Sequence, residues 1–431
     1  MNERPKTFIG VQPEIPGLEA HEQDVSVNLS LPYSDLTNIW IPEDSIYEKA
    51  LRTLPLGRLA NIKQLSFLSY VSPNPEKTYF LPYSHDRLDH SLTVALVAEK
   101  MLRQNRLPED KINLGILAGF LHDIATPAHG DPVKYLDPET LNEETHWLET
   151  LDEKSKKFLG QFGAAGEAMD EIISNQGVLG KVLDIADRIA YTMKDLQAIH
   201  TDTRSPAINL NPYLVFINLI LSHNPKIGNI YQEVGIDEKK QEVFFNDPKH
   251  LEVLLLLRAH LFQNLYLHPT NQGRDLFITQ LIKPLYSRDA SSELNPQNLR
   301  QMGDFTLMNI VFHHYKPFLS HGEVAYPDLV NWHPEFERFD SIADAQKREE
   351  ELRQNENIAV VGIKECKGFD PATNYKVATR YKYVEFRGFD PGASRQIEAI
   401  AESTKGIFLF WADVSEDSNT NRLLRTVLKN N

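Results

Sequence analysis

Cysteine is nearly absent from this sequence: Cys366 is the single one among 431 residues. A chain with one thiol forms no intrachain disulfide, which suits a reducing compartment. Positive charge is also scarce, because 45 Lys and Arg stand against 60 Asp and Glu and leave a formal net charge of -15. Such a chain is not expected to bind nucleic acid in general, although a local basic pocket for a small phosphorylated ligand stays compatible with it.

Long apolar segments are missing as well. The longest apolar runs, such as residues 213–221 and 253–257, are too short to cross a bilayer. Residues 1–10 carry charges and a proline and lack the apolar stretch of a signal peptide. We therefore expect a soluble, cytoplasmic protein that makes no membrane contact.

The spacing of apolar residues favours a mostly α fold with a small C-terminal α+β lobe. Hydrophobic residues make up 41% and charged residues 24% of the chain, a balance that supports a large core. Helical periodicity is strong over residues 89–104, 112–123, 143–162, 177–200, 250–286 and 302–319. Short β-rich runs at 358–363, 381–386 and 406–411 predict strands on either side of a helix at 393–403. We expect an irregular arm over 1–40 with a short strand at 24–31, a helical domain over 41–325, and the α+β lobe over 326–431.

Four side chains from three predicted helices form a set of metal ligands, namely His90, His122, Asp123 and Asp187. Two imidazoles and two carboxylates suit one divalent metal of intermediate hardness. On a helix, His122 and Asp123 lie about 100° apart, so both can lean into one cavity. A metal would also satisfy two polar groups at the end of an otherwise apolar helix, where unpaired burial is costly. A structural ion pair among these residues is the alternative.

The order of these residues resembles that in the HD-domain metal phosphohydrolases. The similarity extends to Ile62–Leu65 and Ser84–Leu92, which look like the IKQLG and SHxRFEHSLG motifs of the deoxynucleoside triphosphate triphosphohydrolases. That branch includes bacterial dGTPases and the animal SAM-and-HD-domain dNTPase. The run from Asp187 to Asp195 is similar to its third motif, and Arg258 and Tyr266 keep the spacing of its phosphate-binding arginine and sugar-contacting tyrosine. The resemblance covers about residues 38–325.

The resemblance implies a role for each matching residue. One divalent metal ion would be bound by His90, His122, Asp123 and Asp187, and the sequence does not distinguish among Mn, Fe, Mg, Zn, Ni and Co. Substrate contacts would come from Gln64, Leu65, Arg87, Arg188, Tyr191, Asp195, Arg258 and Tyr266. Among these, the three arginines would hold the triphosphate, because guanidinium groups bind phosphate oxygens in a bidentate way. The amide and the carboxylate would hold the sugar 3′-hydroxyl, and the two tyrosine rings would pack against sugar and phosphate.

The second motif departs from the family, where it reads HDxGHxPFSH. Here the residues from His122 onward read HDIATPAHGD, so Thr126 replaces the first additional histidine. His129 or Asp131 takes the place of the second, and His146 lies one helical turn beyond the position of a later family histidine. These three are our candidates for the acid that protonates the leaving group.

Two further positions in the resembling segments carry expectations of their own. His85, in the first long motif, is a candidate for a functional role. Leu267 follows Tyr266 where the animal enzyme has Gln, so base or sugar recognition is expected to differ.

The sequence therefore predicts a metal-dependent hydrolase of nucleotides, most simply a dNTP triphosphohydrolase that releases deoxynucleoside and triphosphate. One alternative is another HD phosphohydrolase, such as a phosphodiesterase or nucleoside monophosphatase, which fits the lost histidine but gives Arg258 and Tyr266 no role. The sequence has neither the Gly-Tyr-Pro motif of cyclic-dinucleotide enzymes nor the His-Asp-x-x-Glu-Asp motif of alarmone hydrolases. A non-catalytic HD module that binds a nucleotide is the other alternative. The expected partner is a small-molecule nucleotide, and the resemblance implies a homo-oligomer.

Overall fold

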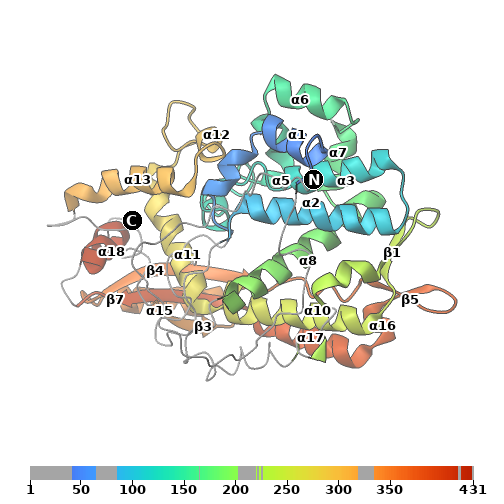
Figure 1. Ribbon diagram of the computed structural model, residues 1–431. Helices are drawn as coiled ribbons and strands as arrows, with labels where there is room; N and C mark the ends of the chain where they lie inside the picture. The colour runs from blue at the N-terminus through green and yellow to red at the C-terminus, as the bar shows by residue number, and fades with distance from the viewer. Residues whose placement is uncertain are drawn as a thin grey trace, which may run out of the picture. The chain divides into compact units, whose positions relative to one another are not determined.

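The computed structural model describes residues 41–64, 85–164, 166–201, 220, 223–224, 227–318, 334–415 and 419–429 (Figure 1). The predicted arm over 1–40, its strand at 24–31, and Leu65 lie outside these residues. The helices are α1 (Ile46–Thr53), α2 (Arg87–Gln104), α3 (Glu109–Leu121), α4 (Asp131–Lys134), α5 (Glu143–His146), α6 (Glu153–Gly160), α7 (Glu167–Ile173), α8 (Gly177–Thr201), α10 (Pro248–Leu261), α11 (Pro269–Ile282), α12 (Pro296–Leu299), α13 (Asp304–Tyr315), α15 (Ile342–Arg353), α16 (Phe386–Phe389), α17 (Pro391–Ser403) and α18 (Asn419–Lys429). Short 3₁₀ segments are η1 (Leu56–Asn61), η3 (Trp147–Thr150), η5 (Ile227–Glu233), η7 (Lys283–Leu285) and η8 (Lys316–Phe318), and η6 (Phe262–Tyr266) is a π-helical turn. The strands are β1 (Val234–Asp237), β2 (Glu242–Phe245), β3 (Glu335–Phe339), β4 (Ile358–Lys367), β5 (Lys376–Ala378), β6 (Tyr383–Glu385) and β7 (Lys405–Asp413).

Three helices form the part of the core that carries the predicted metal ligands. Helix α2 packs against both α3 and α8, and Figure 1 shows α2 and α3 side by side. The two helices approach closely because α3 has a glycine at the contact: a Cβ on Gly119 would lie 2.5 Å from the Cα of Ala95. Helix α2 begins where the Asp86 side chain accepts a hydrogen bond from the Asp89 N–H, as an N-cap does. The packing of α2, α3 and α8 therefore sets the distances between side chains from three separate sequence segments.

Most predicted helices are present with bounds close to the expected ones, but the helix expected over 143–162 is wrong. The chain forms α5, η3 and α6 there instead. Leu151 is extended, and the Asp152 side chain starts α6 by accepting a hydrogen bond from the Ser155 N–H. The local capping signal outweighs the apolar periodicity, and the apolar side chain of Leu148 is 37% exposed.

The predicted strands are confirmed as β4, β6 and β7, although β6 is short and β4 extends to Lys367. Strand β7 lies between β3 and β4 and is antiparallel to both. A second sheet has the order β1-β2-β5-β6, and the sequence analysis missed its β1–β2 hairpin. Strands β2 and β5 are parallel, with Phe244 opposite Lys376 and Phe245 opposite Val377. Residues on both sides of the predicted boundary at 325 thus share one sheet. The boundary itself falls within residues 319–333, which the structure does not describe, and stays a prediction.

The mostly α fold with a few strands toward the C-terminal end is confirmed. Among the described residues, no helix combines the length and apolar content that crossing a membrane requires.

Candidate metal centre and substrate cavity

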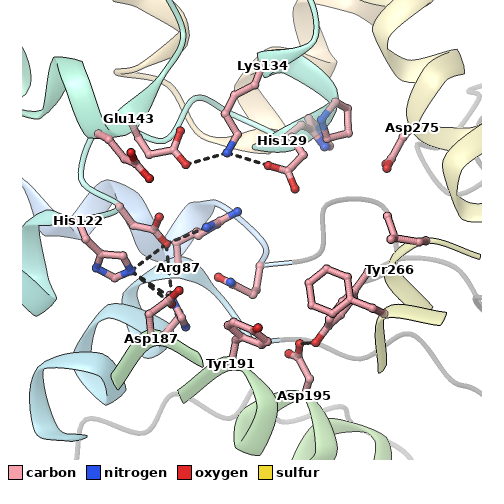
Figure 2. A pocket seen from close by; sticks show the side chains of 18 of the residues that line it. Arg87, His122, His129, Lys134, Glu143, Asp187, Tyr191, Asp195, Tyr266 and Asp275 are labelled. Carbon is pink, nitrogen blue, oxygen red and sulfur yellow. Dashed lines mark hydrogen bonds and ion pairs between the residues drawn. The ribbon is translucent and has the colours of Figure 1, made fainter. Parts of the chain in front are cut away.

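The four predicted ligands converge from α2, the end of α3, and α8. The Nε2 atom of His90 lies 3.2 Å from the Nε2 atom of His122 and 3.0 Å from Oδ1 of Asp187. The Nε2 atom of His122 lies 3.8 Å from the same carboxylate oxygen, and Figure 2 shows these two side chains turned toward each other. Oδ2 of Asp123 lies 3.7 Å from each imidazole Nε2. The fold therefore brings His90, His122 and Asp187 together as a possible metal site, whereas Asp123 lies beside both imidazoles and remains a predicted ligand.

The orientation of His122 shows that the donor set fits a cation. Its Nδ1 lies 2.9 Å from the carbonyl oxygen of Gly119, so we assign the ring proton to Nδ1 and a lone pair to Nε2. That lone pair faces the Nε2 of His90, so it can bind a cation or accept a hydrogen bond from the His90 ring. Two metal–nitrogen bonds of about 2.0–2.1 Å in tetrahedral geometry place their nitrogens about 3.3 Å apart, close to the observed separation.

The Asp123 carboxylate lies just beyond the end of α3 and is 5% exposed. Burial acts to raise the pKa of this carboxyl, but the charges of Arg87, His122 and His90 outweigh it and hold the pKa well below its ordinary value. The guanidinium of Arg87 donates a 2.7 Å hydrogen bond to Oδ2. For Asp187, burial likewise opposes ionisation, and the hydrogen bond and charge of His90 lower the pKa. Both acids are therefore present as carboxylates, the form that binds metal.

A cavity of about 360 Å³ opens beside this cluster. Its size is within the range of about 300–1,000 Å³ that is usual for small-molecule sites. Carboxylates dominate its lining: Asp123, Asp131, Glu143, Glu144, Asp184, Asp187, Asp195 and Asp275. Among the described residues that line it, Arg87 and Lys134 are the cationic side chains apart from histidine. The cavity is thus strongly acidic before any metal is bound.

Five of the predicted substrate-binding residues line this cavity: Gln64, Arg87, Tyr191, Asp195 and Tyr266. The Tyr266 hydroxyl donates a hydrogen bond to Asp195, and His85 Nε2 lies 3.4 Å from the other oxygen of that carboxylate. Oε1 of Gln64 is buried and has no hydrogen-bond partner among the described residues. An amide oxygen without a partner beside a carboxylate and a tyrosine makes a polar subsite.

Arg188 and Arg258 do not line the cavity. Arg188 is paired with Asp184 and with Asp370, at 3.0 and 3.1 Å from its Nη2. Arg258 donates hydrogen bonds to the Tyr191 hydroxyl and to the Asp370 carbonyl oxygen. Both guanidinium groups are therefore directed toward a loop of the C-terminal part of the chain.

The three candidates for the leaving-group acid have different surroundings. His129 lines the cavity in a left-handed backbone conformation (φ 61°), and its N–H donates a 2.7 Å hydrogen bond to Asp304. Burial lowers the pKa of its imidazole, with Asp304 opposing. Asp131 also lines the cavity, but the Lys134 ammonium at 2.7 Å lowers the pKa of its carboxyl to about 2, so it carries no proton at neutral pH. His146 is not brought to the cavity, because its ring bonds Glu149 and the Glu139 carbonyl.

The sequence analysis missed several lining residues, among them Lys134, Glu143 and Asp275. Lys134 bridges Asp131 and Glu143, each at 2.7 Å, and Figure 2 shows Lys134 and Asp275 across the cavity from Asp187. Burial raises the pKa of the Asp275 carboxyl to about 7, against the charge of Lys364. Asp275 therefore holds a proton at or just below neutral pH. It is the only acidic residue in the sequence of α11, a signal that draws attention to it only once the helix is known to face the cavity.

Comparisons with known proteins support the domain but not its substrate. Residues 87–192 match the HD domain family, and this range contains His90, His122, Asp123 and Asp187. HD domains bind divalent metals, in agreement with the possible site formed by His90, His122 and Asp187. An uncharacterized protein of Methanocaldococcus jannaschii is 26% identical over 264 residues, which cover 59% of this chain and 49% of that protein. The chain thus spans about half the length of the curated relative it matches.

Two solved structures resemble this chain over most of its length. A hypothetical protein from Aquifex aeolicus has a TM-score of 0.57 at 15% identity and covers 91% of this chain and 99% of its own. A phosphohydrolase from Bacteroides thetaiotaomicron has a TM-score of 0.61 at 15% identity and covers 88% of this chain and 98% of its own. At such identity these likenesses show the fold alone. The HD domain is confirmed, and the dNTP triphosphohydrolase branch stays a prediction.

Proposed function

We propose that this chain, with an HD domain over residues 87–192, is a metal-dependent phosphohydrolase of nucleotides, and that dNTPs are its substrates. One observation carries the proposal: His90, His122 and Asp187 each bring a ligand atom within 4.8 Å of the other two, and Oδ2 of Asp123 lies 3.7 Å from both imidazole Nε2 atoms. The name of the structurally similar Bacteroides protein agrees with this reaction class.

The side chains around the cluster suit phosphoryl chemistry. A divalent cation held by the four ligands would supply positive charge that polarises a phosphoryl oxygen and lowers the pKa of water. Arg87 is fixed by Asp123 at 2.7 Å and lines the cavity, so its remaining N–H groups can hold a phosphoryl oxygen. Asp275, whose pKa is raised to about 7, can protonate a leaving oxygen near neutral pH.

The nucleotide part of the proposal depends on the polar subsite of Gln64, Asp195 and Tyr266. A sugar hydroxyl can donate to the amide or carboxylate oxygen while the tyrosine ring covers the sugar face. All three residues line the same cavity as the metal ligands. A deoxynucleotide could therefore place its phosphate at the cluster and its sugar at this subsite.

A nucleotide with a single phosphate is a second candidate substrate, as in a nucleoside monophosphatase. The observation that favours it is the acidic lining, in which Arg87 and Lys134 are the cationic side chains besides histidine among the described lining residues. A triphosphate carries more negative charge than a monophosphate and loses more Coulomb energy against these carboxylates.

A substrate panel tests both candidates. Purified protein is incubated with each dNTP and each dNMP in Mn²⁺ or Mg²⁺, and nucleoside, phosphate and triphosphate are separated by anion exchange. Release of deoxynucleoside with intact triphosphate supports the dNTP proposal, whereas release of phosphate from dNMPs alone supports the second candidate. Protein that binds metal but turns over no nucleotide in either metal would contradict the proposed function. His122→Ala serves as the inactive control.

A further inference from the structure

Two arginines on neighbouring helices, the buried Arg258 and the half-buried Arg188, bind one loop of the C-terminal part of the chain. The loop follows β4, and its Asp370 accepts from both: the carboxylate lies 3.1 Å from Nη2 of Arg188 on α8, and the carbonyl oxygen accepts from Nη1 of Arg258 on α10. The ring of Phe369 stacks on Phe262 at 4.7 Å and lies 5.5 Å from the Arg258 guanidinium. Asp370 thus presents a carboxylate and a carbonyl oxygen to two guanidinium groups.

The two arginines have more binding capacity than this loop uses. Arg258 is 5% exposed and donates to two neutral oxygens, the Tyr191 hydroxyl and the Asp370 carbonyl. A guanidinium forms stronger hydrogen bonds with an ionised acceptor than with a neutral one. Nη1 of Arg188 is buried and has no hydrogen-bond acceptor among the described residues. Both side chains are therefore suited to an anion with more oxygens than Asp370 supplies.

Both arginines contact side chains that line the cavity. Arg188 follows the metal-ligand candidate Asp187 directly, and its partner Asp184 lines the cavity. Arg258 bonds Tyr191 and packs under Phe262, and both of these line the cavity too. Asp370 is therefore linked to the cavity wall through one side chain on each helix, Arg188 on α8 and Arg258 on α10.

The loop is bounded by two residues in the left-handed backbone region, Gly368 (φ 77°) and Ala372 (φ 54°). The Asp370 carboxylate also accepts a 2.9 Å hydrogen bond from the Ala372 N–H through its Oδ1. The loop therefore has a defined shape of its own, and its contact with Arg188 uses the other carboxylate oxygen.

We propose that Asp370 is a specificity-determining residue, which occupies Arg188 and Arg258 in place of phosphate oxygens and must be displaced by a linear polyphosphate. The inference rests on the proposed function and adds the basis on which triphosphate and monophosphate are distinguished. With Asp370 in place, the site offers Arg87 and Lys134 to one phosphoryl group. With Asp370 displaced, the guanidinium groups of Arg188 and Arg258 become available to the remaining phosphates of the polyphosphate. The apparent affinity for polyphosphate is the intrinsic affinity multiplied by the fraction of molecules in which Asp370 is displaced from the two arginines.

The test compares inorganic triphosphate with inorganic phosphate as probes, by calorimetric titration of the full chain. Asp370→Asn removes the charge and keeps an Oδ1 acceptor for Ala372, and Asp370→Ala removes both. We expect each variant to bind triphosphate about tenfold more tightly than wild type, with phosphate affinity unchanged. The matched control is Glu350→Ala, which removes one exposed carboxylate from α15 and should change neither affinity.

Adding Arg188→Ala to Asp370→Asn should abolish the gain. An unchanged triphosphate affinity in both Asp370 variants, an equal gain for phosphate, or a gain that survives Arg188→Ala would each overturn the inference. Tighter triphosphate binding in a protein that hydrolyses no nucleotide would leave the inference intact and reject the proposed function. Nucleotide hydrolysis without tighter triphosphate binding in the Asp370 variants would support the proposed function and reject the inference about Asp370.

Discussion

His90 and His122 face each other across the α2–α3 contact with their Nε2 atoms 3.2 Å apart. The rings meet edge to face, at 61° and with centroids 5.3 Å apart. Because the Gly119 carbonyl oxygen accepts a hydrogen bond from the Nδ1–H of His122, the ring is fixed with the Nε2 lone pair toward His90. The His122 ring is thus held in the tautomer and orientation that a metal ligand needs.

Loss of one of these rings should empty the metal centre. We expect His122→Ala to lower the metal content of purified protein at least tenfold, because loss of an outer hydrogen bond alone costs about 10–100-fold in affinity. Elemental analysis measures it. His146→Ala is the control, since that ring bonds Glu149 away from the cavity. Equal metal content in the two variants would contradict the proposed ligand set.

The Arg87–Asp123 pair should matter most when no metal is bound. Arg87→Ala leaves a buried carboxylate without its 2.7 Å partner, and we expect a loss of about 3–5 kcal/mol of unfolding free energy in chelator. Saturating Mn²⁺ should restore part of this loss, because the cation then neutralises Asp123. Urea titrations with EDTA and with Mn²⁺ measure both values. The same loss in both conditions would show that Asp123 does not bind the metal.

The close approach of α2 and α3 should tolerate no side chain at residue 119. In Gly119→Ala the new Cβ would lie 2.5 Å from backbone of Ala95, which must move, and we expect a loss of about 1–3 kcal/mol. Metal affinity should fall as well, since His122 lies three residues on. Gly57→Ala is the matched control, because nothing lies within 4 Å of its Cβ position. Thermal unfolding and metal titration of both variants measure these losses, and equal stability and metal affinity in the two variants would contradict the prediction.

Asp275 should make the fold less stable as pH rises. Its pKa is raised to about 7 in the folded chain, from an ordinary value near 3.8, so the folded state binds more protons between these values. Stability contributed by this group is therefore lost as pH rises from about 4 to about 7 and is constant above. The unfolding free energy of Asp275→Asn relative to that of wild type should therefore increase between pH 4 and pH 7, as measured by urea titrations in chelator. A constant difference across the window would contradict the raised pKa.

The same variant tests the proton donor. If Asp275 protonates the leaving oxygen, Asp275→Asn removes the high-pH limb of the activity profile, which follows a group with pKa about 7. A variant of Asp131, whose pKa is about 2, should leave that limb in place. Profiles of kcat for wild type and both variants provide the measurement.

Sequence reasoning identified candidate metal ligands because their residue types are rare in apolar helices. His122 and Asp123 follow an apolar run, and His90 and Asp187 each occur in a periodic helix, and the fold brings His90, His122 and Asp187 close together. Long helices such as α2 and α8 were predicted because their apolar residues recur at helical spacing. The broken helix after residue 142 was not, since the Asp152 cap is a single-residue signal within a periodic stretch.

Tertiary contacts explain why the surroundings of the other site residues differ from those predicted. Nothing near Arg188 or Arg258 in the sequence indicates that both meet Asp370, which lies 112 residues beyond Arg258. Lys134 and Asp275 likewise reach the cavity from segments with no motif. A resemblance to family motifs assigns a residue type to a position, but it does not report which partner this chain supplies there.

The parallel pairing of β2 with β5 has a consequence for dividing the chain. Phe244 and Phe245 use one edge of their strand for β1 and the other for Lys376 and Val377. A fragment that stopped near residue 325 would leave the second edge of β2 bare, and an unpaired edge invites association with other chains. The halves of this protein, produced separately, should therefore aggregate alone and recover solubility when they are co-expressed.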